Sequence, residues 1–81
     1  MKLTKVSGLK LIKFLEKLGY SIVRRRGSHI RLEKETKLGK HKITVPFHKE
    51  IAIGTLNSIL KNVSLYNNVP KEKLIELLNE L

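Results

Sequence analysis

The chain has 81 residues, with 17 Lys and Arg against seven Asp and Glu, no cysteine and a formal net charge of +10 at pH 7. This length predicts a single domain over residues 1–81, and the lack of cysteine excludes disulfides and thiolate metal ligands. Lysines interrupt every apolar stretch near the N-terminus, and no run approaches the length of a membrane helix. We therefore expect a cytoplasmic protein without a signal peptide or membrane contact.

The positive charge is concentrated in the first three quarters of the chain. Residues 1–61 contain 15 basic and four acidic side chains, a net charge of +11, whereas residues 62–81 have a net charge of −1. A basic body with a near-neutral tail is typical of a protein that binds a polyanion such as nucleic acid. A lysine-rich solvated surface without such a partner is the alternative that composition leaves open.

The first predicted element is an amphipathic helix over about residues 7–18. Ser7 is a suitable N-cap, and apolar residues follow it at helical spacing. Gly19 supplies the left-handed residue that commonly ends such a helix. These local signals agree with one another along the whole segment.

Three short segments with alternating apolar and polar residues predict strands. They cover residues 20–26, 29–33 and 41–45. The Gly27-Ser28 pair predicts a tight turn, and Gly39 is the expected turn residue of the second connection. Pro46 ends the third strand because it has no backbone N–H for a sheet ladder.

Two more helices are predicted after a loop over residues 47–54. We expect Thr55 to cap the first of them, Asn67-Asn68 to end it, and Pro70 to open the second at its first position. Their apolar faces consist of Leu56, Ile59, Leu60 and Val63 in the first and of Leu74, Leu77, Leu78 and Leu81 in the second. The order helix, three strands, helix, helix indicates an α+β domain with an antiparallel sheet.

Alternation in the strands places His29 on the outside of the sheet. If the apolar residues of the second strand face the helices, His29 projects from the opposite, solvent-facing side. In the first strand, the same alternation places Arg24 on one face with Ile22. Other polar residues expected beside His29 are Arg31, Lys42 and Thr44.

An exposed imidazole among cations suits acid–base chemistry on a phosphodiester. Cleavage of RNA needs few groups, because the 2′-hydroxyl already lies beside the phosphate. A base, an acid and a cation for the developing charge suffice without a metal. The candidate RNA-binding residues around the turn are Arg24, Arg25, Arg26, Gly27, Ser28, Arg31 and Lys42.

The same residues also have plainer interpretations. A lone exposed histidine is usually a surface residue, and three successive arginines are usually a solvated strand edge. His41 lies on the apolar side of its strand, where a structural role is favoured, and His48 is either a second acid/base or a hydrogen-bonding residue of its loop. The three histidines have no metal-site spacing, and the chain contains no Asp and no glycine-rich phosphate loop. We therefore expect neither a metal nor a cofactor.

Four segments in order resemble the HicA mRNA interferase toxins of HicA–HicB toxin–antitoxin systems. They are Ser7-Gly8 with Leu11 to Gly19-Tyr20, Val23-Arg24 through Gly27-Ser28-His29, Thr44-Val45-Pro46-Phe47-His48, and Gly54-Thr55-Leu56 with Ile59-Leu60-Lys61. Each segment alone is a weak signal, whereas the ordered set over about residues 7–65 is specific. One departure is Ser64, where the family more often has glycine, and it leaves the geometry of residues 62–69 open.

The resemblance implies a double-stranded-RNA-binding-domain-like fold, to which this chain adds a short C-terminal helix. It also implies a type II toxin that cleaves mRNA and is inhibited by a HicB-like antitoxin. In that family the histidine of the Gly-Ser-His turn is catalytic, which corresponds to His29, and a second histidine corresponds to His48 as a candidate acid/base. The alternative is a non-catalytic double-stranded RNA-binding module on the same fold. The turn combined with the Val-Pro-x-His segment favours the enzyme.

Overall fold

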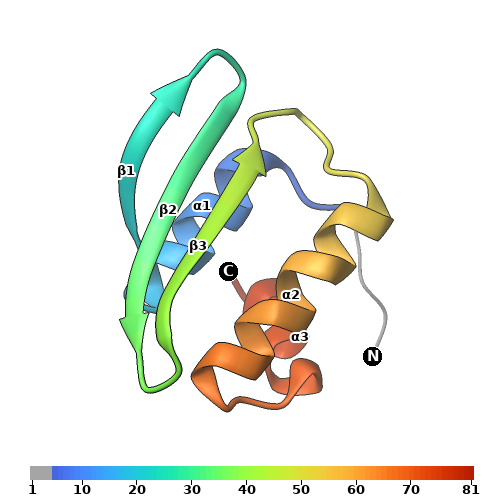
Figure 1. Ribbon diagram of the computed structural model, residues 1–81. Helices are drawn as coiled ribbons and strands as arrows, with labels where there is room; N and C mark the ends of the chain where they lie inside the picture. Colours follow the sequence, from blue (N-terminus) through green and yellow to red (C-terminus); the bar gives the residue numbers. More distant parts are fainter. Residues whose placement is uncertain (1–4) are drawn as a thin grey trace.

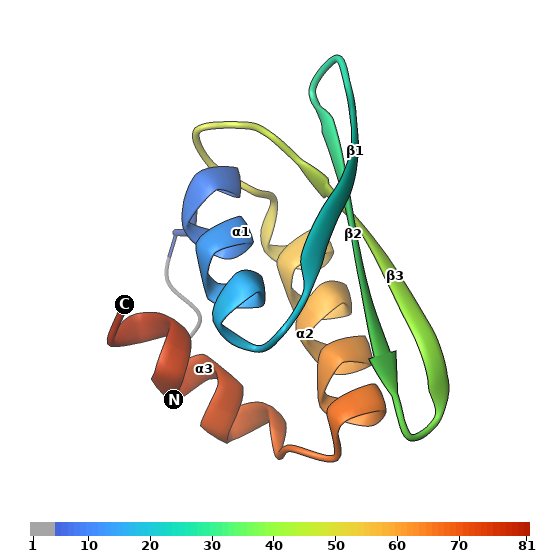
Figure 2. The ribbon, with the colours of Figure 1, turned by 90° about the vertical axis from the view of Figure 1, so that its left-hand side faces the viewer.

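The computed structural model describes residues 5–81 as three strands and three helices (Figure 1). Their order is α1 (Gly8–Lys17), β1 (Ser21–Arg26), β2 (His29–Thr36), β3 (Gly39–Pro46), α2 (Ile53–Asn67) and α3 (Lys71–Asn79). The strands form one antiparallel sheet in the order β1-β2-β3. All three described helices lie on one side of this sheet, and no element of residues 5–81 covers its other face (Figure 2). This α+β, double-stranded-RNA-binding-domain-like fold confirms the expectation from the sequence.

Helix α1 forms where its local signals predict it. The side chain of Ser7 accepts a hydrogen bond from the backbone N–H of Lys10 at 3.1 Å, which satisfies one of the free donors of the first turn. The helix ends at Lys17 with Leu18 as its C-cap, and Gly19 follows with a φ of 103°, a left-handed conformation that favours glycine. The N-cap at Ser7 and the left-handed Gly19 thus define the two ends of the helix that packs on the sheet.

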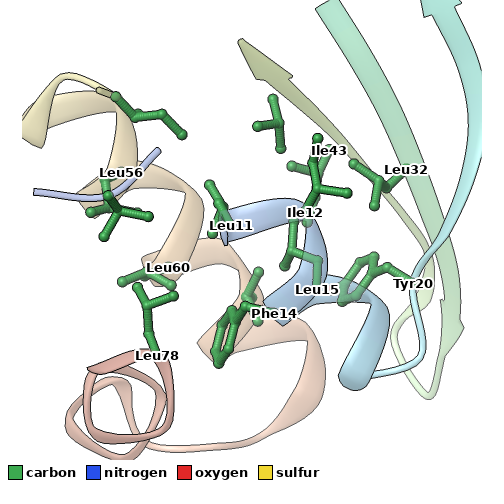
Figure 3. Packing of buried hydrophobic residues seen from close by; sticks show 14 of the residues in the cluster. Leu11, Ile12, Phe14, Leu15, Tyr20, Leu32, Ile43, Leu56, Leu60 and Leu78 are labelled. Carbon is green, nitrogen blue, oxygen red and sulfur yellow. The ribbon is translucent and has the colours of Figure 1, made fainter. Parts of the chain in front are cut away.

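The hydrophobic core lies between the sheet and the helices (Figure 3). Leu15 of α1, Leu32 of β2 and Leu60 of α2 are each fully buried. Helix α3 adds Leu78, which lies near Phe14 and Leu60 on the side of the core away from the sheet. Each such side chain contributes about 1.5–3 kcal/mol by leaving water, so this thin core depends on every layer.

Several element boundaries differ from the sequence prediction, including the start of β3, which lies at Gly39 and not at residue 41. Strand β2 continues to Thr36 because its polar end stays paired with β3 up to Gly39, although apolar alternation has ceased there. Helix α2 begins at Ile53 with Ala52 as its N-cap, so Thr55 lies inside the first turn and does not cap it. Pro70 is the N-cap of α3 and not its first helical residue.

At the C-terminal end of the chain, α2 ends at the Asn67-Asn68 pair as predicted, and α3 shows one further difference. Ser64 stays helical, and α2 ends at Asn67, followed by Asn68 in the left-handed region with a φ of 53°. The hydroxyl of Ser64 donates to the carbonyl of Val69 at 2.5 Å, which closes this end. In α3, Leu81 is exposed instead of contributing to the apolar face, because the helix already ends at Asn79. Among residues 5–81, no helix is long and apolar enough to cross a membrane.

Candidate functional site

The turn between β1 and β2 places His29 at the start of β2. Arg26 pairs with His29 across the strands, so Gly27 and Ser28 form a two-residue hairpin loop. Gly27 has a φ of 58° and is exposed, which explains the glycine at this position. His29 alternates with the buried Ile30 and is itself exposed, and its predicted position on the open face is confirmed.

The open face of the sheet consists of rows of side chains that run across the three strands. Pairing between the strands defines these rows. They are Arg26, His29 and Pro46 in the first row, Arg24, Arg31 and Thr44 in the second, and Ser21, Glu33 and Lys42 in the third. The first two rows contain no carboxylate, whereas the third does. In these rows, the excess of positive over negative side chains is therefore found at the end of the sheet that carries the turn.

A β-bulge at Val23 puts Arg24 into the second row. The pairing register shifts between Ile22, which lies opposite Leu32 on the helix side, and Arg24, which lies opposite Arg31 on the open face. Simple alternation would have kept Arg24 on the face of Ile22, and that prediction is wrong. Bulges commonly redirect a side chain in this way next to functional sites.

Five exposed side chains line one hollow of about 260 Å³ on this face. They are Arg24, Arg26, His29, Arg31 and Thr44. Three guanidinium groups supply permanent positive charge and planar donors that match phosphate oxygens. The imidazole adds a group that can accept or donate a proton. The hollow therefore combines groups that can bind a phosphate with a group that can transfer a proton.

Several candidate residues lie outside this hollow. Arg25 pairs with the buried Ile30 and so turns to the helix side of the sheet. Lys42 shares the open face but lies opposite Glu33 and lines a different hollow beside α2. His48 follows β3, is exposed and does not line the hollow of His29.

Gly8 has a role near the site that local sequence patterns do not predict. Its backbone N–H donates to the carbonyl of His48 at 2.9 Å, and the N–H of Phe47 donates to the carbonyl of Ser28 at 2.6 Å. A Cβ on Gly8 would lie 2.5 Å from the carbonyl oxygen of Pro46. The start of α1, residues 46–48 and the His29 turn are thus joined through the backbone. The Ser7-Gly8 pair of the family resemblance was the only sequence signal for this junction.

His41 belongs to a second polar cluster on the helix side of the sheet. Its Nδ1 lies 2.6 Å from the hydroxyl of Tyr20, which also accepts a hydrogen bond from the Asn67 amide at 2.9 Å. The ring of Tyr66 stacks on the imidazole with centroids 4.0 Å apart. His41 is only 6% exposed, and this burial lowers its pKa below the usual 6.5. The buried structural position expected for His41 is confirmed.

The lowered pKa of His41 predicts a loss of stability in weak acid. The unfolded chain binds a proton at His41 below about pH 6.5, whereas the folded chain resists it, so the free energy of unfolding falls as the pH decreases from 7.5 to 5. Urea unfolding at both pH values measures this decrease. His41→Gln, which keeps an acceptor for Tyr20, should show a smaller decrease than the wild type. An equal decrease in both proteins would contradict the assignment.

Fold and surface together define a small α+β protein with an arginine-lined hollow and an exposed histidine on the open face of its sheet. Residues 8–65 match the family model described as HicA toxin of bacterial toxin-antitoxin, and the chain belongs to this family. The resemblance inferred from the four segments is thereby confirmed, and membership implies a toxin role with an antitoxin partner. Helix α3 lies beyond the matched residues. No curated protein and no solved structure gives a significant match.

Within residues 5–81, no cluster of three or more His, Cys, Asp or Glu side chains could hold a metal ion.

Proposed function

We propose that this protein is the toxin of a type II toxin–antitoxin system and acts in the cytoplasm as a metal-independent endoribonuclease on mRNA. The observation that carries the proposal is the exposed His29 in a hollow with three arginines and no carboxylate, on a member of a toxin family. A polyanionic substrate also agrees with the net charge of +10.

The proposed reaction uses the 2′-hydroxyl of the substrate as the nucleophile. Its oxygen forms a bond to phosphorus while the bond from phosphorus to the 5′-oxygen breaks, which yields a 2′,3′-cyclic phosphate and a 5′-hydroxyl end. One proton leaves the 2′-hydroxyl and one is delivered to the 5′-oxygen. We assign one of these transfers to His29. The guanidinium group of Arg26, which lies opposite His29, stabilises the charge that develops on the phosphate oxygens, and Arg24 and Arg31 bind the RNA strand beside it.

The partner of His29 in proton transfer is a separate question. His48 is the candidate that the family resemblance provides. Its backbone is held next to the turn, because its carbonyl accepts a hydrogen bond from Gly8 and the neighbouring Phe47 donates one to Ser28. Its side chain lies outside the hollow in this structure. We therefore propose His48 only as a second acid/base that acts when RNA is bound, and His48→Ala tests it by a change in the pH profile of the cleavage rate.

The proposed inhibitor is a HicB-like antitoxin that covers the hollow. Because three arginines lie there without a carboxylate, such a protein must present acidic or acceptor groups to them. Inhibition is then expected to require one antitoxin site per toxin and to compete with RNA.

A cleavage assay with excess EDTA tests the proposed function. The purified protein is expected to cut an end-labelled mRNA fragment under these conditions, and stoichiometric antitoxin is expected to stop the cut. Binding of the RNA without any cut would favour the alternative, a non-catalytic double-stranded RNA-binding module. In that case affinity would depend on salt and on the arginines but not on His29.

A further inference from the structure

We propose that the second row, Arg24, Arg31 and Thr44, is a separate phosphate subsite. It would hold the phosphate next to the scissile one on the same RNA strand. The inference rests on the proposed function, because it places the scissile phosphate at His29 in the first row. It adds a substrate requirement, namely two consecutive phosphates, and it gives Thr44 a role.

The charge of the hollow exceeds what one phosphodiester can compensate. Three guanidinium groups line it, and a single phosphodiester carries one negative charge. Arg24 and Arg31 lie directly opposite each other on β1 and β2, an arrangement of like charges that destabilises a sheet. Within residues 5–81, neither of them forms an ion pair. An anion bound between them would relieve this repulsion.

The spacing of the two rows fits consecutive phosphates. His29 and Arg31 are two residues apart on β2 and point to the same face, which separates their rows by about 7 Å along the strand. This separation is comparable to that between neighbouring phosphates on an extended nucleic-acid strand. Thr44, on the other side of Arg31, contributes a hydroxyl donor that can reach a phosphate oxygen together with the guanidinium fork.

The third row limits the subsite to one additional phosphate. Glu33 lies in that row, next to Arg31 along the open face, and its carboxylate is 3.7 Å from the Nζ of Lys40. A carboxylate at this place repels a further phosphate, and Lys42, which lies opposite Glu33, does not line the hollow of His29. The cationic surface beside His29 therefore extends over the first two rows of the open face.

Binding of short deoxynucleotides tests the subsite without any cleavage step. The dissociation constants of TpT, with one phosphate, and TpTpT, with two, are measured by NMR titration at low salt. For the wild type we expect TpTpT to bind about tenfold more tightly, the effect of one charge-assisted contact. In Arg31→Gln and in Thr44→Val this ratio should shrink toward one.

Arg25→Gln is the matched control, because it removes the same charge from the neighbouring residue on the helix side of β1. It should alter the affinities for both ligands by the same factor and so keep the ratio. Arg31→Gln also removes the like-charge pair with Arg24, so its free energy of unfolding should equal or exceed that of the wild type.

Two results would overturn the subsite, a wild-type ratio near one or an unchanged ratio in Arg31→Gln. Either can be told apart from a failure of the proposed function. A protein that shows the expected ratios but does not cleave RNA keeps the subsite and loses the enzymatic proposal. If the wild-type protein cleaves RNA but Arg31→Gln leaves the affinity ratio of the two ligands unchanged, the enzymatic proposal stands and the subsite is wrong.

Discussion

Replacing His29 with alanine is expected to lower the rate of RNA cleavage by about 10²- to 10⁴-fold, the usual contribution of one general acid or base. The imidazole of His29 lines the hollow with the three arginines, and we propose it as a proton-transfer group. The variant keeps those arginines, so RNA binding should persist while turnover is lost. The measurement is a single-turnover cleavage rate with the protein in excess, together with the affinity for a non-cleavable strand.

Stability serves as the control for this variant. Because His29 is exposed and makes no contact with the core, its replacement should change the free energy of unfolding by no more than about 0.5 kcal/mol. A loss of activity in a fully folded His29→Ala protein supports the catalytic assignment. A His29→Ala protein that cuts RNA at the wild-type rate would remove His29 from the mechanism.

Replacing Gly8 with alanine is expected to be the most damaging change of a small residue. The new methyl group would lie 2.5 Å from the carbonyl oxygen of Pro46 and 2.9 Å from the Cα of Phe47, and both are backbone atoms that cannot rotate away. Such overpacking typically costs about 1–3 kcal/mol of stability. Displacement of residues 46–48 should also disturb the turn, because Phe47 holds the carbonyl of Ser28, and activity should fall with stability.

Gly54 provides the matched control for Gly8. It also lies in the first turn of a helix, but nothing is within 4 Å of a Cβ placed there. Gly54→Ala should therefore leave stability unchanged or raise it by up to about 1 kcal/mol through the lower entropy of the unfolded chain. Urea unfolding of both variants decides the matter. If Gly8→Ala were as stable as Gly54→Ala, the close approach of α1 to residues 46–48 would be wrong.

The elements with strong local signals could be predicted from the sequence, and those that depend on pairing could not. Ser7 and Gly19 mark the two ends of α1, so the limits of this helix could be predicted from the sequence. The bulge at Val23 depends on how β1 pairs with β2, and no residue type in β1 predicts it. The predicted N-cap of α2 was wrong for a similar reason, because Ala52 caps this helix without a side-chain hydrogen bond and so leaves no sequence signal.

The candidate site was predictable only in part. Strict alternation in β2 correctly placed His29 and Arg31 on the open face, since a residue's face follows from its parity within a strand. Alternation in the sequence already separates Arg25 from Arg24, but only the pairing of β1 with β2 shows which face of the sheet each of them occupies. The close approach at Gly8 arises from tertiary packing between segments about 40 residues apart, which local patterns do not encode.

The most direct measurement compares two RNA strands that differ by one oxygen atom. One is an RNA that the wild-type protein cuts at a mapped position, and the other has a single 2′-deoxyribose at that position, both with excess EDTA. Attack by the 2′-hydroxyl predicts rapid cutting of the first strand and none at the substituted position of the second. Cutting at the 2′-deoxy position would contradict the reaction proposed for His29.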